Sequence, residues 1–69
     1  MTTFIHLSAD VGDGTKFGDN VKIWHYAQVR EDAILGEGCI ISRGAYIGTG
    51  VTLGKNCKVQ NYALVYEPA

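Results

Sequence analysis

The sequence lacks an excess of charge of either sign and lacks any long apolar run. The formal net charge is -1, with acidic and basic residues interspersed, so no basic patch is predicted to bind DNA, RNA or anionic lipid. The longest apolar stretches span only a few residues, far short of the roughly 20 that cross a bilayer. The first residues also lack the basic flank and apolar block of a secretory signal. We therefore expect a soluble, cytoplasmic protein with no nucleic-acid or membrane partner.

Cysteine and histidine are too scarce and too widely spaced for a zinc-type site. Cys39 and Cys57 lie eighteen residues apart, and His6 and His25 lie elsewhere in the chain, so no CxxC-type ligand set exists. We predict no metal. Both cysteines occupy small-residue positions of the repeat described next, which favours buried, reduced thiols. A disulfide between them is the alternative, although the bond geometry is demanding.

A six-residue repeat runs through the whole chain. Every sixth residue is a bulky apolar one: Ile5, Val11, Phe17, Ile23, Val29, Leu35, Ile41, Ile47, Leu53, Val59 and Val65. The residue four places after each is small or modest in size: Ala9, Thr15, Val21, Ala27, Ala33, Cys39, Ala45, Val51, Cys57, Ala63 and Ala69. A period of six fits neither a helix nor one continuous strand. Short strands separated by corners fit it, and the copies must stack to bury a core, so we predict an all-β solenoid in a single domain of residues 1–69.

The residue three places after each bulky one marks the corners. This position holds Ser8, Gly14, Asn20, Tyr26, Asp32, Gly38, Gly44, Gly50, Asn56, Tyr62 and Pro68. Gly, Asn and Asp are the residue types that best tolerate positive φ. With three sides to each coil, residues eighteen apart would stack at about 4.8 Å, in columns such as Ile5, Ile23, Ile41 and Val59.

The sides of the predicted coil differ in character. The hexads FGDNVK, LGEGCI and LGKNCK keep glycine after each bulky residue, which suggests a solvated face. The hexads IHLSAD, IWHYAQ, ISRGAY and VQNYAL carry large aromatic and polar residues instead: His6, Trp24, His25, Tyr26, Gln28, Arg43, Tyr46, Gln60, Asn61 and Tyr62. Aromatic residues and arginine are enriched in interface cores. We expect a partner subunit, a ligand or both on this side.

The hexad pattern resembles the hexapeptide-repeat acyltransferase superfamily, whose fold is a left-handed parallel β-helix. The segments IWH, VRE, KVQN and VYE narrow the resemblance to the N-terminal half of bacterial sugar-nucleotide N-acetyltransferases. These enzymes act on UDP-2-acetamido-3-amino-glucuronate or dTDP-3-amino-deoxyhexoses. The resemblance implies about 3.5 triangular coils without helix, and a chain truncated relative to the family, without the coils that bind coenzyme A.

The same resemblance implies transfer of acetyl from acetyl-CoA to the amine of a nucleotide sugar. It also implies a homotrimer, or two trimers stacked end to end, with active sites between subunits. Such chemistry needs a general base or relay, for which His25 is the first candidate and His6 the second. Gln28, Arg30, Glu31 and Asn61 are the candidate substrate-binding residues, with Arg30 suited to a diphosphate by its fork of donors. The candidate interface residues are Trp24, Tyr26, Arg43, Tyr46 and Tyr62.

Each assignment has a structural alternative. His25 beside Trp24 is more often a packed interface residue than a base, and Arg30 with Glu31 is more often an ion pair than a substrate site. The sequence also departs from the family: Ser42-Arg43-Gly44 replaces Gly-Gln-Asn, and Tyr62 replaces an Asn. Both changes add bulk and favour altered packing. The alternative function is therefore a non-catalytic trimeric scaffold or interaction module.

Overall fold

The structure is a computed structural model that describes residues 3–66. Within these residues the chain forms two-residue strands and no helix, which confirms the all-β prediction. The strands are β1 (Phe4–Ile5), β2 (Asp10–Val11), β3 (Lys16–Phe17), β4 (Lys22–Ile23), β5 (Gln28–Val29), β6 (Ile34–Leu35), β7 (Ile40–Ile41), β8 (Tyr46–Ile47), β9 (Thr52–Leu53), β10 (Lys58–Val59) and β11 (Leu64–Val65). Residues 3–66 thus contain no helix of the length and apolarity that a bilayer crossing requires.

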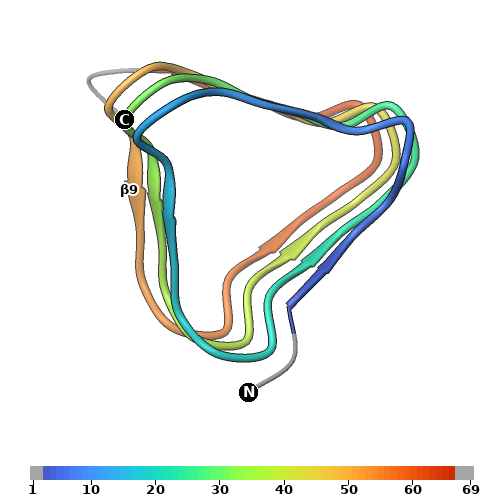
Figure 1. Cartoon of the computed structure of the whole chain (residues 1–69). Helices are drawn as coiled ribbons and strands as arrows, with labels where there is room; N and C mark the ends of the chain where they lie inside the picture. Colours follow the sequence, from blue (N-terminus) through green and yellow to red (C-terminus); the bar gives the residue numbers. More distant parts are fainter. Residues whose placement is uncertain (1–2, 67–69) are drawn as a thin grey trace.

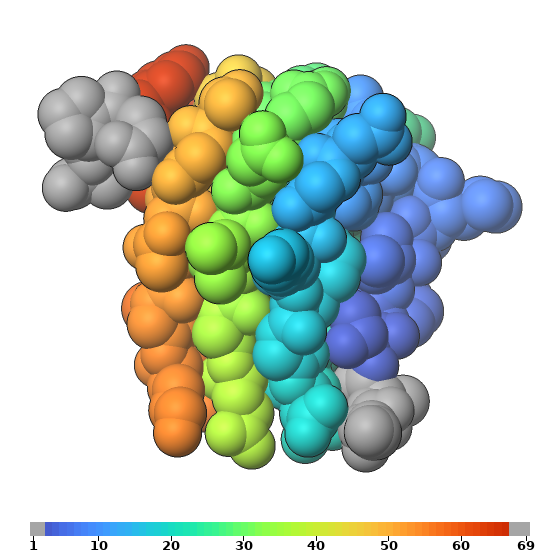
Figure 2. All heavy atoms as spheres, turned by 60° about the vertical axis from the view of Figure 1, so that its left-hand side comes forward, coloured from blue at the N-terminus to red at the C-terminus, as the bar shows by residue number. Residues whose placement is uncertain are grey.

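The strands stack into three parallel sheets that form the sides of a triangular prism (Figure 1). Sheet A has the order β1-β4-β7-β10, sheet B the order β11-β8-β5-β2, and sheet C the order β3-β6-β9. Each strand pairs with the strand eighteen residues away, so that Ile23 lies between Ile5 and Ile41. Figure 2 shows successive coils as parallel bands across the face of sheet C. The solenoid is consistent with a left-handed β-helix of hexapeptide repeats.

The core is built from the second residue of each strand and from the small residue that follows each corner. In the middle coils both kinds are buried, including Ile23, Val29, Leu35, Ile41, Ile47, Ala27, Ala33, Cys39 and Ala45. The first residue of each strand faces outward and is exposed or half-buried. The predicted columns of inward residues are therefore confirmed, because the strand register stacks like positions of successive coils.

Both cysteines lie on the inner side of the coil as free thiols. Cys39 is fully buried and its Sγ donates a hydrogen bond of 3.0 Å to the carbonyl oxygen of Gly54. Burial raises the pKa of the Cys39 thiol, so this group is a poor nucleophile. Cys57 is half-buried and packs against the core. The prediction of a buried, reduced thiol is thus confirmed fully for Cys39 and in part for Cys57.

Three corners connect the sheets, and each is named by the sheets it joins. The A–B corner holds residues 6–8, 24–26, 42–44 and 60–62; the B–C corner holds residues 12–14, 30–32 and 48–50; the C–A corner holds residues 18–20, 36–38 and 54–56. Positive φ occurs at the predicted position in nine of these turns: Gly14, Asn20, Tyr26, Asp32, Gly38, Gly44, Gly50, Asn56 and Tyr62. From Tyr26 onward, the backbone N–H of this residue donates a hydrogen bond to the preceding coil, as from Gly44 to the His25 carbonyl at 2.9 Å.

Ser8 lies in the first turn of the A–B corner, as predicted, but it is not among the residues of positive φ. The backbone N–H of Ser8 instead donates to Nδ1 of His6 at 3.0 Å. The Ser8 hydroxyl then receives the backbone N–H of Tyr26 at 3.0 Å, in place of a carbonyl. A side-chain bond can thus substitute for the regular corner geometry. The predicted corner at Pro68 and the small position at Ala69 lie outside the described residues.

Candidate functional site

An open depression of about 440 Å³ lies beside the A–B corner. Its lining comes from two outward strand residues of sheet A and from the corner residues of three successive coils: Trp24, His25, Ile40, Ser42, Arg43, Lys58 and Asn61. The repeat places them together, since positions eighteen residues apart stack on one another. Four predicted site residues therefore converge here: His25, Asn61, Trp24 and Arg43.

The two histidines stack at the edge of this depression. The ring centroids of His6 and His25 lie 3.7 Å apart, with an angle of 37° between the ring planes. Nδ1 of His6 accepts the Ser8 N–H at 3.0 Å and lies 2.9 Å from the Ser8 hydroxyl, which assigns the His6 ring proton to Nε2. His6 is therefore held in place by Ser8, while His25 lines the depression. The geometry supports His25 ahead of His6 as the group that meets a ligand.

Trp24 is supported from the neighbouring coil by Phe4. Their ring centroids lie 5.1 Å apart, and the Trp24 and His25 rings are nearly parallel, at 15° and 6.5 Å. Trp24 nevertheless remains 37% exposed. A wide apolar ring held open beside polar side chains can stack on another ring or pack against a partner. The arrangement of Trp24 is therefore compatible with contact to a partner subunit or to a ligand, both of which the sequence predicts for this side.

Two tyrosines at the A–B corner adopt a backbone conformation that disfavours large side chains. Tyr26 has φ 60° and Tyr62 has φ 61°, where a bulky residue is strained. Both are exposed, at 62% and 65%, so burial in the core does not explain them. The structure gives them one shared contact: the Arg43 guanidinium lies 5.6 Å from the Tyr26 ring centroid, and Arg43 Nε donates to the Tyr62 hydroxyl at 3.3 Å.

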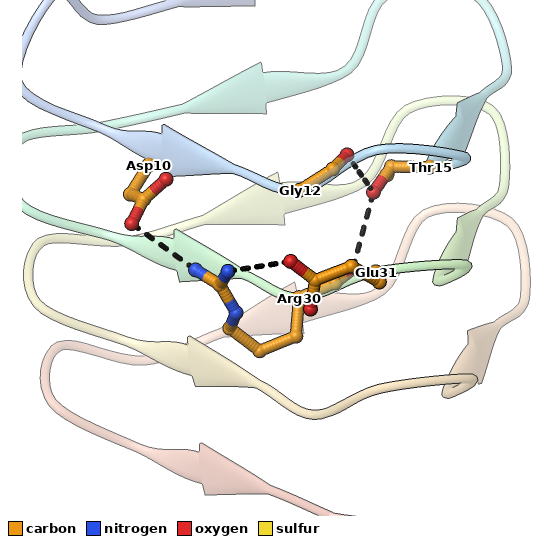
Figure 3. A network of polar contacts seen from close by, with 5 residues as sticks. All are labelled: Asp10, Gly12, Thr15, Arg30 and Glu31. Atoms are coloured by element: carbon orange, nitrogen blue, oxygen red, sulfur yellow. Dashed lines mark hydrogen bonds and ion pairs between the residues drawn. The ribbon is translucent and has the colours of Figure 1, made fainter.

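Arg30 and Glu31 lie at the B–C corner, one side of the prism away from His25. Arg30 donates to Glu31 Oε2 at 2.7 Å and to Asp10 Oδ2 at 3.1 Å (Figure 3). Thr15 links the same two coils through bonds of 2.8 Å to the Gly12 carbonyl and 3.1 Å to the Arg30 carbonyl. Arg30 and Glu31 therefore form an ion pair, which was the alternative to a substrate-binding role for these two residues. The structure does not bring them to the depression.

The ion pair with Arg30 should affect the pKa of Glu31. The pKa of Glu31 lies below its ordinary value, chiefly because its own backbone N–H donates a hydrogen bond to the carboxylate and secondly because Arg30 does. A lowered carboxyl pKa contributes stability above the pKa of the unfolded chain, and this contribution is lost as the pH falls through the folded-state value. Arg30→Gln should raise the Glu31 pKa in an NMR titration, while Lys55→Gln at the C–A corner should leave it unchanged. Equal Glu31 values in both variants would contradict the pairing.

Two predicted residues lie on the outer face of sheet B. Gln28 on β5 and Tyr46 on β8 are direct neighbours in the register. Tyr46 also contacts Tyr66, with 5.3 Å between ring centroids. The aromatic side predicted from the sequence is therefore divided between a corner and a flat face, because the six-residue blocks used to group it include both.

Three lining residues were not among the predicted site residues. Ile40 and Lys58 are outward strand residues of sheet A, and Ser42 follows β7 as a buried corner residue. For Ile40 and Lys58 the sequence signal is their stacking position, since Phe4, Lys22, Ile40 and Lys58 stack on the outside of sheet A. The residue types at the corners contain no information about this outward column.

A profile described as bacterial transferase hexapeptide (six repeats) matches residues 14–49. The chain is also similar to the acyl-[acyl-carrier-protein]--UDP-N-acetylglucosamine O-acyltransferase of Campylobacter concisus (strain 13826), with 39% identity over 61 residues. The match covers 88% of this chain and 23% of the relative, so the chain spans about a quarter of that protein's length. No solved structure matches the chain significantly.

Proposed function

Because the chain belongs to the bacterial transferase hexapeptide family, we propose that it supplies the acceptor-binding coils of an acyltransferase that acetylates a nucleotide-sugar amine from acetyl-CoA. The observation that carries this proposal is the convergence of His25 and Asn61 in one open depression. The relative from Campylobacter concisus acts on a UDP-linked N-acetyl sugar, which supports a nucleotide sugar as acceptor. The N-acetyl chemistry rests on the resemblance of the sequence motifs.

His25 acts as the base in the proposed reaction. The neutral amine attacks the carbonyl carbon of the thioester, and a ring nitrogen of His25 takes the proton that the amine loses as the new C–N bond forms. The C–S bond then breaks, and the proton returns to the departing sulfur, so that coenzyme A leaves as a thiol. Asn61 has an amide that can both donate and accept and would hold a sugar hydroxyl. Trp24 would pack against the sugar ring.

The proposal includes a homotrimer with sites between neighbouring subunits. Arg30 and Glu31 lie at another corner from His25, so within one chain they cannot surround the same small ligand. A ligand seated against His25 of one subunit would meet Arg30 and Glu31 only from a neighbouring subunit. To bind a phosphate of the ligand, Arg30 would then have to break its ion pair with Asp10 or Glu31.

A second candidate function is a non-catalytic trimeric scaffold or interaction module. Tyr26 and Tyr62 favour it, since both are exposed and strained and aromatic side chains of this kind are common in interface cores. Thermal-shift titration separates the two functions, because a ligand that binds the native state raises its apparent stability. Stabilisation by acetyl-CoA or a UDP-sugar supports the enzyme, and no shift with either supports the scaffold.

The test of the enzyme is acetyl transfer by His25→Gln. We expect its rate of amine acetylation to fall by about 100-fold or more, since general-base catalysis contributes typically 10²–10⁴-fold. Glutamine keeps hydrogen-bonding capacity but cannot take the proton. His6→Gln is the matched control and should retain most of the activity, because His6 is held by Ser8. A full rate in His25→Gln would contradict the assignment.

A further inference from the structure

The depression beside the A–B corner is positively charged, although the chain as a whole has a formal net charge of -1. Its lining includes Lys58 and Arg43, and no aspartate or glutamate is among the lining residues. A concave site with cations of this kind attracts anions.

Arg30, the other arginine of the chain, differs from Arg43 because it is paired with carboxylates. Both ion pairs within residues 3–66 are made by Arg30, which binds Asp10 and Glu31. Lys58 and Arg43 have no carboxylate partner among the residues that the structure describes. Within residues 3–66, two cations therefore face the same depression without a carboxylate beside them, and an anionic ligand could pair with both.

Arg43 is also held in position rather than left free. Its guanidinium lies over the ring of Tyr26 and its Nε donates to the hydroxyl of Tyr62. The Tyr62 ring in turn covers Gly44, because a Cβ placed on Gly44 would collide with that ring. With Nε engaged, the terminal nitrogens of Arg43 remain able to bind a ligand. The two strained tyrosines thus orient the cation, which lowers the entropy that binding must overcome.

We propose that Lys58 and Arg43 form an anion subsite in this depression, and that Tyr26 and Tyr62 are positioning residues for Arg43. The subsite takes a phosphate or carboxylate group attached to a ring that lies near Trp24. The inference rests on the proposed function in placing the acceptor at the same depression. It goes further by naming the residues that bind the negative charge of the acceptor, which are Lys58 and Arg43.

Trp24 makes the proposal directly measurable. It lines the depression and is the single tryptophan of the chain, so its fluorescence reports on this site alone. We expect a saturable change of emission with inorganic pyrophosphate or with glucuronate, and none with glucose, which is the neutral counterpart of glucuronate. Pyrophosphate binding would identify a phosphate as the source of the charge, and glucuronate binding a carboxylate. Equal responses to glucose and to the anions would overturn the proposal.

Lys22 provides a matched control for Lys58. Both lysines are exposed, both are the first residue of a sheet A strand, and both pair with Ile40, but only Lys58 lines the depression. Lys58→Met should weaken anion binding by about 10-fold or more, as expected for a lost charged hydrogen bond. Lys22→Met makes the same change of charge and should leave the affinity unchanged. Equal losses in both variants would show a diffuse charge effect and overturn the subsite.

Tyr62→Phe tests the positioning role. It removes the hydroxyl that receives Arg43 Nε but keeps the ring, so the melting temperature should hardly change while anion affinity falls several-fold. Combining it with Arg43→Gln should give no further loss beyond Arg43→Gln alone, since the hydroxyl acts through the arginine. Additive losses would overturn the positioning role. If charged and neutral acceptors were acetylated at equal rates, the anion subsite would be overturned but the proposed function would stand. If anions bound but no acetyl group were transferred, only the proposed function would be overturned.

Discussion

Replacing Gly36 by alanine should strongly destabilise the protein. A Cβ on Gly36 would lie 2.7 Å from the carbonyl carbon of Gly54, 2.8 Å from its oxygen and 2.9 Å from the backbone nitrogen of Lys55. These atoms belong to the backbone of the next coil and cannot rotate away. Moving the coils apart would stretch the 2.9 Å bond from the Gly36 N–H to the Leu53 carbonyl. We expect a loss of about 3 kcal/mol, which lowers the melting temperature by more than about 10 °C.

Gly54→Ala is the matched control. Gly54 occupies the same corner position one coil later, yet no atom of the described residues lies within 4 Å of the corresponding Cβ. Alanine there should be neutral or should stabilise by about 0.4–1 kcal/mol, because it restricts the unfolded chain. Thermal unfolding followed by circular dichroism compares the two variants. Similar melting temperatures would show that the coils are not packed this closely at the C–A corner.

Ile41→Ala should cause the second large loss of stability. Ile41 is fully buried and lies between Ile23 and Val59 in one column of the core. Truncation leaves a cavity between stacked coils whose spacing is fixed by backbone hydrogen bonds, so the site cannot collapse easily. We expect the free energy of unfolding to fall by about 2–5 kcal/mol, measured by urea denaturation.

Ile34→Ala controls for the residue type. Ile34 also lies in a two-residue strand, but it faces outward and is 44% exposed. Removing the same atoms there should cost less than about 1 kcal/mol. If Ile34→Ala proved as damaging as Ile41→Ala, the assignment of inner and outer positions would be wrong.

Much of the fold follows from the hexad alone. The period of six specifies which residues face inward, and the stacking of Ile5, Ile23 and Ile41 follows once three sides make a coil. The corner positions with positive φ can also be predicted, because Gly, Asn and Asp recur at them. Ser8 departs because a histidine two residues earlier offers its N–H a partner, and a repeat pattern contains no information about such a bond.

The candidate site could be predicted only in part. His25, Asn61 and Arg43 were predicted from residue type, and the structure brings them to one depression. Lys58 was missed because its role depends on the outward column of sheet A. The partner of Arg30 at Asp10 was missed because the two residues are twenty positions apart and become neighbours only through the coil geometry. The close contact between Gly36 and the next coil could not be predicted, because the recurrent glycine at this position was interpreted only as the sign of a solvent-exposed face.

The constant offset of eighteen residues between paired strands has an evolutionary consequence. Inserting or deleting a single residue within the coils would turn every later side chain to the opposite surface and misalign every later turn. Gain or loss of one complete eighteen-residue unit would preserve both alignments, because each unit contacts only the units directly before and after it. Proteins of this architecture should therefore change length mainly by duplication or loss of whole turns, and intermediate lengths should survive only as loops that project from a corner.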